Sequence, residues 1–138
     1  MEVSFRPEMV WGGFALFRDA ALSHLLGNLV AWNRFLLTQA PFPSLYGSGV
    51  RYIREDYSSE HPEQWEDLIE ILRRGGGDCE DLACWRTAEL QHRGERARVV
   101  WHRRILGPGR TLLHILVERG NGRLENPAYT RHPWFSEP

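Results

Sequence analysis

The chain has 138 residues, a formal net charge of −1 and 42% hydrophobic residues, which is the composition of a globular protein and not of a disordered or fibrous one. This length predicts a single domain over residues 1–138 with its own hydrophobic core. The balanced charge gives no electrostatic reason to expect a nucleic acid or an anionic membrane as a partner.

The N-terminal region and the cysteines predict a cytoplasmic location. No signal peptide opens the chain, and the apolar stretch 9–37 contains too many charged and amide residues for a membrane span. The two cysteines, Cys79 and Cys84, are five residues apart and are expected on one helix, where a disulfide is geometrically unfavourable. We therefore expect a soluble protein with free thiols and no membrane partner.

Helical spacing of apolar residues predicts a first helix over 17–39, which Pro41 ends. An irregular loop follows, with a short extended piece over 50–52. The stretch 63–72 predicts a second helix with Pro62 at its first turn. We expect its inward side chains to be Trp65, Leu68, Ile69 and Leu72.

The glycine run 75–77 ends this second helix, and a third helix is expected over 79–92. Gly94 follows it as a left-handed cap. Beyond this point apolar residues alternate, which predicts strands over 97–103, 111–118 and 123–126. Helices followed by an antiparallel β-meander give an α+β architecture, with the N-terminal helices packed on the C-terminal sheet.

Cys79 is the first candidate functional residue, because the motif Gly-Gly-Gly-Asp-Cys places it where a glycine turn leads into a helix. The positive end of the helix dipole favours thiolate, which is the nucleophilic form, and the Cys79 N–H is a natural oxyanion donor. Asp78 is expected to be the N-cap. Glu80 and Asp81 suit the dipole but oppose a thiolate by like charge, so a paired imidazolium is needed.

His114 and Asn126 are the candidate partners of this thiol. If residues 120–122 form a three-residue loop, Leu116 lies opposite Asn126, and Asn126 lies on the face of His114 and within its reach. A two-residue loop would instead bring Glu125 to that face. We expect the three-residue loop, closed by a left-handed glycine at a bulge.

Two simpler interpretations remain open. An unpaired cysteine is usually a small buried hydrophobe, and this applies to Cys79 and still more to Cys84 in the helix body. A metal site could be built from Cys79, Cys84, His102 and His114, but the Cys-x4-Cys spacing is poor for zinc. We expect no metal and no cofactor.

These motifs resemble those of the transglutaminase-like superfamily of papain-fold cysteine enzymes, over roughly residues 64–128. The run 77–83 is similar to the family's nucleophile motif, 114–118 to its histidine strand and 124–127 to its third motif. The resemblance implies a catalytic triad of Cys79, His114 and Asn126. It also implies acyl transfer through a thioester, with a protein or peptide substrate.

The chain departs from the family pattern at two places. Asn126 stands where the family more often has aspartate, which gives the papain-type Cys-His-Asn arrangement, and an asparagine stabilises imidazolium less than a carboxylate does. Ile115 and Leu116 replace the aromatic residue expected after the histidine. The second oxyanion donor is open: Tyr46, Tyr52 and Trp65 are contenders, but each is also readily explained as a core aromatic.

The upstream stretch 44–52 also resembles that of small transglutaminase-like proteins encoded by tailed bacteriophages and prophages. This second resemblance implies an alternative function on the same fold, a non-catalytic structural or assembly accessory. Its partners would be phage structural proteins and its location the virion.

Overall fold

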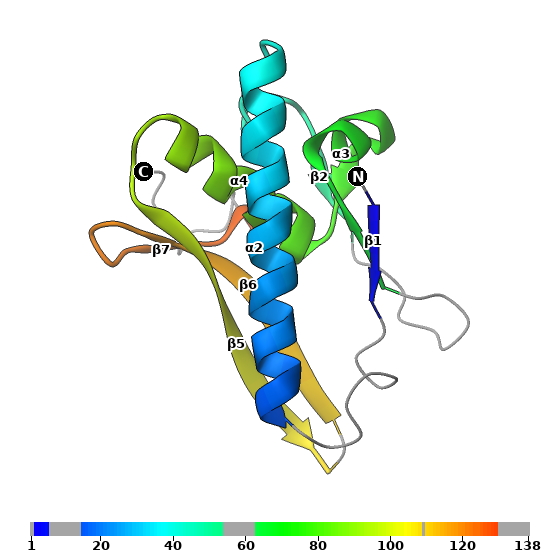
Figure 1. The fold of residues 1–138 in the computed structure, drawn as a ribbon. Helices are drawn as coiled ribbons and strands as arrows, with labels where there is room; N and C mark the ends of the chain where they lie inside the picture. The colour runs from blue at the N-terminus through cyan, green and yellow to red at the C-terminus, as the bar shows by residue number, and fades with distance from the viewer. Residues whose placement is uncertain (1, 6–14, 54–62, 109, 130–138) are drawn as a thin grey trace.

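The fold is known from a computed structural model that describes residues 2–5, 15–53, 63–108 and 110–129. The described residues form three helices, seven strands and one 3₁₀ turn (Figure 1). In chain order these are β1 (Glu2–Phe5), α2 (Ala15–Gln39), β2 (Arg51–Tyr52), β3 (Glu63–Glu66), α3 (Leu68–Arg74), β4 (Gly76–Gly77), α4 (Cys79–His92), β5 (Ala97–Gly107), β6 (Arg110–Arg119), β7 (Leu124–Glu125) and η1 (Pro127–Tyr129).

The main body is a helical layer on one face of a three-stranded antiparallel sheet in the order β5-β6-β7. Helix α4 packs against β5 and β6, and the long helix α2 packs against α4 (Figure 1). The core between these layers includes Leu26, Cys84, Ile115 and Val117, all of which are buried. The expected α+β class, with an N-terminal helix and a C-terminal antiparallel sheet, is therefore confirmed.

Five of the expected elements, two helices and three strands, form at or near the expected positions. The first helix is α2, the third is α4, and Gly94 follows α4 with a φ of 85°. The alternating stretches form β5, β6 and β7. None of the helices in the described ranges combines the length and the apolar character needed to span a bilayer.

The prediction of a helix over 63–72 is wrong in its first half. Residues 63–66 form β3, which pairs antiparallel with β1 so that Trp65 lies opposite Val3. Helix α3 begins only after Asp67, whose carboxylate accepts the Glu70 N–H at 3.0 Å and the Trp32 Nε1–H at 2.9 Å. Strand pairing with a segment about sixty residues away has overridden the local helical pattern.

The inward face predicted for this segment is correct only in part. Trp65 and Leu68 are buried and Leu72 is half-buried, but Ile69 is 44% exposed and Ile71 takes the buried position. The buried stripe of α3 consists of Leu68, Ile71 and Leu72, at the i, i+3, i+4 spacing of one helix face, and Ile69 lies outside it. Pro62 lies outside the described residues.

The glycine run ends α3 and then forms a strand, which the sequence did not predict. Gly75 caps α3 with a φ of 81°, and its N–H donates to the Ile71 carbonyl. Gly76 and Gly77 form β4, which pairs parallel with β2. A Cβ on Gly76 would lie 2.5 Å from the Arg51 carbonyl oxygen, so this pairing requires glycine.

The turn between β6 and β7 has the expected three-residue form. Val117 lies opposite Glu125, and the Arg119 N–H donates to the Arg123 carbonyl at 2.8 Å. Gly122 closes the loop with a φ of 84°. The predicted register is confirmed, and it places Asn126 on the face of His114 and Glu125 on the opposite face.

Candidate cysteine, histidine and asparagine site

Cys79 is the first residue of α4, as the sequence predicts. The helix begins with a capping box in which the Asp78 carboxylate accepts the Asp81 N–H at 3.2 Å and the Asp81 carboxylate accepts the Asp78 N–H at 3.3 Å. Asp81 also accepts the Glu66 N–H at 2.7 Å, which ties the helix to β3. These bonds hold the Cys79 backbone at the positive end of the helix dipole.

The surroundings of the Cys79 thiol are acidic. Asp78, Glu80 and Asp81 are all buried, and the thiol donates a hydrogen bond to Glu80 Oε2 at 3.1 Å. Burial and the neighbouring Asp78 raise the pKa of Asp81 well above its usual range. Carboxylates so close to the sulfur disfavour a thiolate, in opposition to the helix dipole.

His114 lies half-buried on β6, directly opposite His102 on β5. Burial, which is the largest effect, and the charge of His102 lower the pKa of His114, while its hydrogen bond with the Asn126 side chain acts in the opposite direction. The net lowering keeps the imidazole neutral at pH 7. A neutral imidazole is the form that accepts a proton as a general base.

Asn126 joins the sheet to the segment that follows it. Its side chain bonds His114, and its Oδ1 accepts the Ala128 N–H at 3.2 Å at the start of η1. Asn126 is itself buried. The structure thus brings together two of the three predicted site residues, and it does so through the predicted register.

The segment after Asn126 lies at the end of α4 where Cys79 stands. η1 contacts both α4 and β2, and β2 pairs with β4, which directly precedes α4. Cys79 and Ala128 also belong to the same apolar cluster. The chain that carries Asn126 therefore reaches the N-terminal end of α4, beside which η1 is drawn in red-orange in Figure 1.

Cys84 is a small buried side chain in the core, as the simpler interpretation predicts. It is fully buried, with its sulfur 3.8 Å from the Leu26 carbonyl oxygen of α2. Burial, reinforced by the charges of Asp81, Glu80 and Asp78, raises the pKa of the Cys84 thiol well above its usual range. Such a thiol is unreactive at neutral pH.

The alternative of a metal site finds no support in the geometry. Over the part of the chain that the structure describes, no three His, Cys, Asp or Glu side chains are arranged to hold a metal ion. Because the Cys84 sulfur lies against the α2 backbone, it does not join Cys79 and His114 in one ligand set.

A buried ionic network next to the site was missed by the sequence analysis. Glu125 accepts Arg86 Nε–H at 2.6 Å and the Tyr46 hydroxyl at 2.5 Å, and Arg86 also donates to Glu89 at 2.7 Å. The Arg86 guanidinium lies 4.7 Å from the centre of the Tyr46 ring. Tyr46 is thus committed to Glu125, which removes it as a contender for the second oxyanion donor; the three-residue spacing of Arg86 and Glu89 was the only local signal of the network.

The described residues define an α+β protein in which a cysteine begins a helix and a bonded histidine–asparagine pair lies on the adjoining sheet. No protein-family model, curated protein or solved structure is significantly similar to this chain. Its function has to be argued from the geometry of its own residues.

Proposed function

We propose that the protein is a transglutaminase-like cysteine enzyme with a papain-like core, in which Cys79 is the nucleophile, His114 the general base and Asn126 the residue that orients the imidazole. One observation carries the proposal. His114 is bonded to Asn126, and the segment that follows Asn126 packs at the end of α4 that begins with Cys79.

The proposed reaction is acyl transfer through a thioester. His114 accepts the thiol proton, the Cys79 sulfur attacks a carboxamide or peptide carbonyl, and the Cys79 N–H donates to the oxyanion. The imidazolium then protonates the leaving amine as the carbon–nitrogen bond breaks. Water as the second substrate regenerates the thiol and yields an acid, whereas an amine yields a new amide. The substrate in either case is a protein or peptide.

Glu80 has a specific place in this mechanism. In the resting protein the thiol donates to the Glu80 carboxylate, a bond that keeps it protonated. Transfer of its proton to His114 requires the bond to Glu80 to break. The reactivity of Cys79 therefore depends on how easily that bond breaks.

A second function is favoured by the same contact. Cys79 is only 7% exposed, and its bond to Glu80 opposes ionisation. The cavity between α2, α4 and β5, described below, is lined by other residues. These features fit a non-catalytic structural or assembly accessory on the same fold, for example in a phage particle.

Alkylation distinguishes the two functions. With iodoacetamide at about pH 6, where ordinary thiols with a pKa near 8.5 are almost fully protonated, we expect Cys79 to be labelled much faster than Cys84. His114→Ala should abolish the difference. His92→Ala is the matched control, because His92 is exposed at the far end of α4. Equal, slow labelling of both cysteines by mass spectrometry would contradict the enzymatic function.

Turnover is tested separately. A peptide library incubated with the wild-type protein should show hydrolysis or amine incorporation that Cys79→Ser removes and Cys84→Ser leaves intact. A fast-labelling Cys79 without turnover on any peptide, with or without an added amine, would leave the accessory function as the better explanation.

A further inference from the structure

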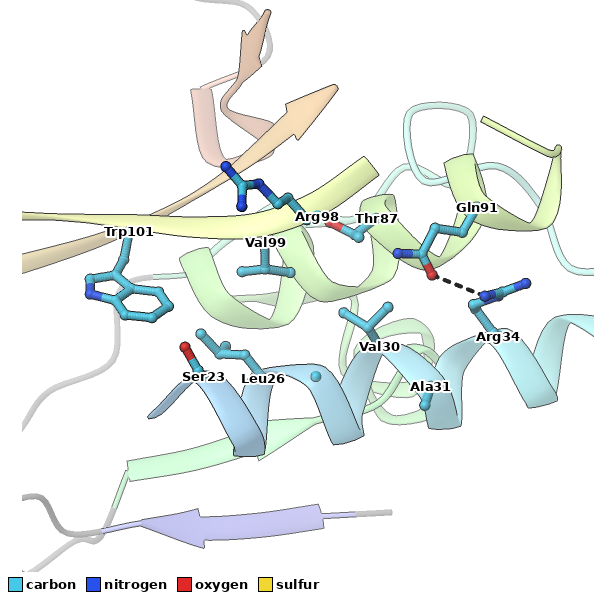
Figure 2. A pocket seen from close by; sticks show the side chains of 11 residues that line it. Ser23, Leu26, Val30, Ala31, Arg34, Thr87, Gln91, Arg98, Val99 and Trp101 are labelled. Carbon is cyan, nitrogen blue, oxygen red and sulfur yellow. Dashed lines mark hydrogen bonds between the residues drawn. The ribbon is translucent and has the colours of Figure 1, made fainter. Parts of the chain in front are cut away.

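A cavity of about 270 Å³ lies between α2, α4 and the edge strand β5 (Figure 2). Cys79, His114 and Asn126 do not line it, so it is separate from the candidate site. The helix α2 contributes one continuous face from Ser23 to Arg34, a rise of about 16 Å at 1.5 Å per residue. The cavity is thus elongated along α2.

The two ends of the cavity differ in chemistry. At one end lie Leu26 and Trp101, with Val30 and Val99 next to them, and Figure 2 shows the Val99 and Trp101 side chains directed toward α2. At the other end lie Arg34, Gln91 and Thr87. The cavity is therefore amphipathic along its length.

Arg34 is the cation of the polar end. Among the described residues its hydrogen-bond partner is Gln91 Oε1 at 3.3 Å, and none of the ion pairs of the described residues includes it. Arg98 also borders the cavity, but its side chain points to the other face of β5, where it bonds Glu118 at 3.0 Å (Figure 2). Among the described residues that line the polar end, Arg34 therefore brings a positive charge and none brings a carboxylate to balance it.

The buried hydroxyl of Thr87 also indicates that a ligand binds at the polar end. Its side chain is fully buried, yet within the described part of the chain its hydroxyl has no hydrogen-bond partner. A buried hydroxyl without a partner is costly, and native proteins satisfy such groups with water or a ligand. Thr87 lines the cavity at its polar end, so a ligand there would supply the missing acceptor or donor.

Gly27 leaves open space in the apolar half of the cavity. No atom lies within 4 Å of a Cβ built on this residue, and Gly27 lines the cavity from the middle of α2. A helix interior ordinarily favours any of the common residues over glycine by up to about 1 kcal/mol. The open space beside Gly27 is the room that a larger side chain would fill.

We propose that this cavity binds a small amphipathic carboxylate, with its anionic group at Arg34 and Thr87 and its apolar chain along Val30, Gly27 and Trp101. The volume is slightly below the range of about 300–1,000 Å³ usual for drug-sized ligands, which fits a compact molecule. The charge of Arg34 selects an acid over an amine, and the apolar walls select an alkyl chain or a ring over a polar body.

Octanoate is the probe that tests this site. Octanoate titrated into the full chain should show saturable binding. Calorimetry and the NMR signal of the Trp101 indole, assigned with Trp101→Phe, monitor the titration. 1-Octanol should bind more weakly and octylamine weakest of all. Arg34→Gln should weaken octanoate about tenfold and leave octanol unchanged, because only the acid uses the charge. Arg51→Gln, an exposed arginine on β2 outside the cavity, is the matched control.

Two further variants separate binding from folding. Gly27→Leu should fill the cavity and reduce octanoate affinity by at least about tenfold, while the Tm of the ligand-free protein stays the same or rises. Thr87→Val removes the unpartnered hydroxyl at nearly constant volume, so the ligand-free Tm should rise while octanoate binds about fivefold more weakly. Equal binding of octanoate and octanol, or octanoate affinity that is unaffected by Gly27→Leu, would overturn the proposal.

Discussion

At the scale of single residues, the ionisation of Cys79 depends on two opposing effects. The start of α4 provides the positive end of a helix dipole, an effect of roughly 0.3–1 kcal/mol in exposed sites and up to about 2 kcal/mol in partly buried ones. The buried Glu80 carboxylate opposes this effect, because its Oε2 accepts a hydrogen bond from the thiol at a sulfur–oxygen distance of 3.1 Å. The carboxylate is the closer of the two and lies in a low-dielectric environment, so it reduces the share of thiolate that the helix dipole and His114 would otherwise give.

Replacement of Glu80 tests this balance directly. Glu80→Gln keeps the shape of the side chain but removes the charge, so the pKa of the Cys79 thiol should fall and its labelling by iodoacetamide near pH 6 should accelerate several-fold. The rate of labelling as a function of pH measures the shift. Glu70→Gln, a half-buried glutamate on α3 that pairs with Arg73, is the control. A Glu80→Gln rate equal to that of the wild-type protein would show that this carboxylate does not govern the thiol.

His114 makes stability depend on pH in a defined window. Because burial lowers the pKa of His114 below its ordinary value of 6.5, the unfolded chain binds this proton more readily than the folded one. The stability that neutral His114 contributes to the folded protein is therefore fully present above about pH 6.5 and is lost as the pH falls below this value. Urea unfolding at a series of pH values should show that His114→Gln flattens this part of the profile. His92→Gln, at an exposed helix end, should leave the slope as it is in the wild type.

At the scale of elements, Gly75 and Gly76 of the glycine run are each required for a different reason. Gly75 adopts the left-handed conformation that ends α3, but a Cβ there would meet no atom within 4 Å. Gly76 has ordinary backbone angles but no room, because a Cβ would lie 2.5 Å from the Arg51 carbonyl oxygen. One glycine is required by conformation and the next by close approach of two backbones.

These two requirements predict different losses of stability when each glycine is replaced by alanine. Gly75→Ala should lower the free energy of unfolding by about 1–2 kcal/mol, the cost of a left-handed alanine. Gly76→Ala should cost more, because β2 has to move away from β4 and the start of α4 moves with it. Urea denaturation measures both values. Only Gly76→Ala should also change the labelling rate of Cys79, and equal effects of the two variants on that rate would contradict the assignment.

At the scale of the whole molecule, the buried ionic network joins three segments that are distant in sequence. Glu125 of β7, Arg86 of α4 and Tyr46 of the loop before β2 meet through hydrogen bonds of 2.5–2.6 Å. Glu89 extends the network by accepting the Leu45 N–H at 2.9 Å. The network fixes the end of β7, and Asn126 is the next residue along the chain.

The buried network predicts a large loss of stability when the charge of Glu125 is removed. Burial, the largest effect, raises the pKa of Glu125, but the hydrogen bonds from Arg86 and Tyr46 and the nearby arginine charges outweigh it and lower the pKa below its ordinary value. Glu125→Gln leaves Arg86 buried with less compensation, so the free energy of unfolding at pH 7 should fall by about 3 kcal/mol.

The same substitution has a pH signature. A carboxyl with a lowered pKa stabilises the folded state above its unfolded pKa, and that stabilisation is lost as the pH falls through the folded value. The difference between wild type and Glu125→Gln should therefore shrink in acid. Glu118→Gln, which breaks the exposed pair with Arg98, should change stability little at any pH. A constant difference across the pH range would contradict the ionic role of Glu125.

Features with local signals can be predicted from the order of the amino acids alone. The bounds of α4 follow from a capping aspartate at one end and a left-handed glycine at the other. The register of β6 and β7 follows from a three-residue glycine turn, and this register was sufficient to predict that Asn126 meets His114. In both cases a few adjacent residues satisfy their own backbone groups.

Features that depend on distant partners follow from the packing of the whole fold and cannot be predicted from local patterns. Residues 63–66 form a strand because β1 pairs with them, and no pattern within the segment encodes that partner. Glu125 bonds Arg86 of α4 and Tyr46 only when β7, α4 and the loop at Tyr46 come together, and these bonds hold the residue next to Asn126. Glu80, which makes the surroundings of Cys79 acidic, is buried in the folded protein as well. Charge and hydrogen-bonding energies depend on which groups are desolvated together, and that is fixed by packing across the whole fold.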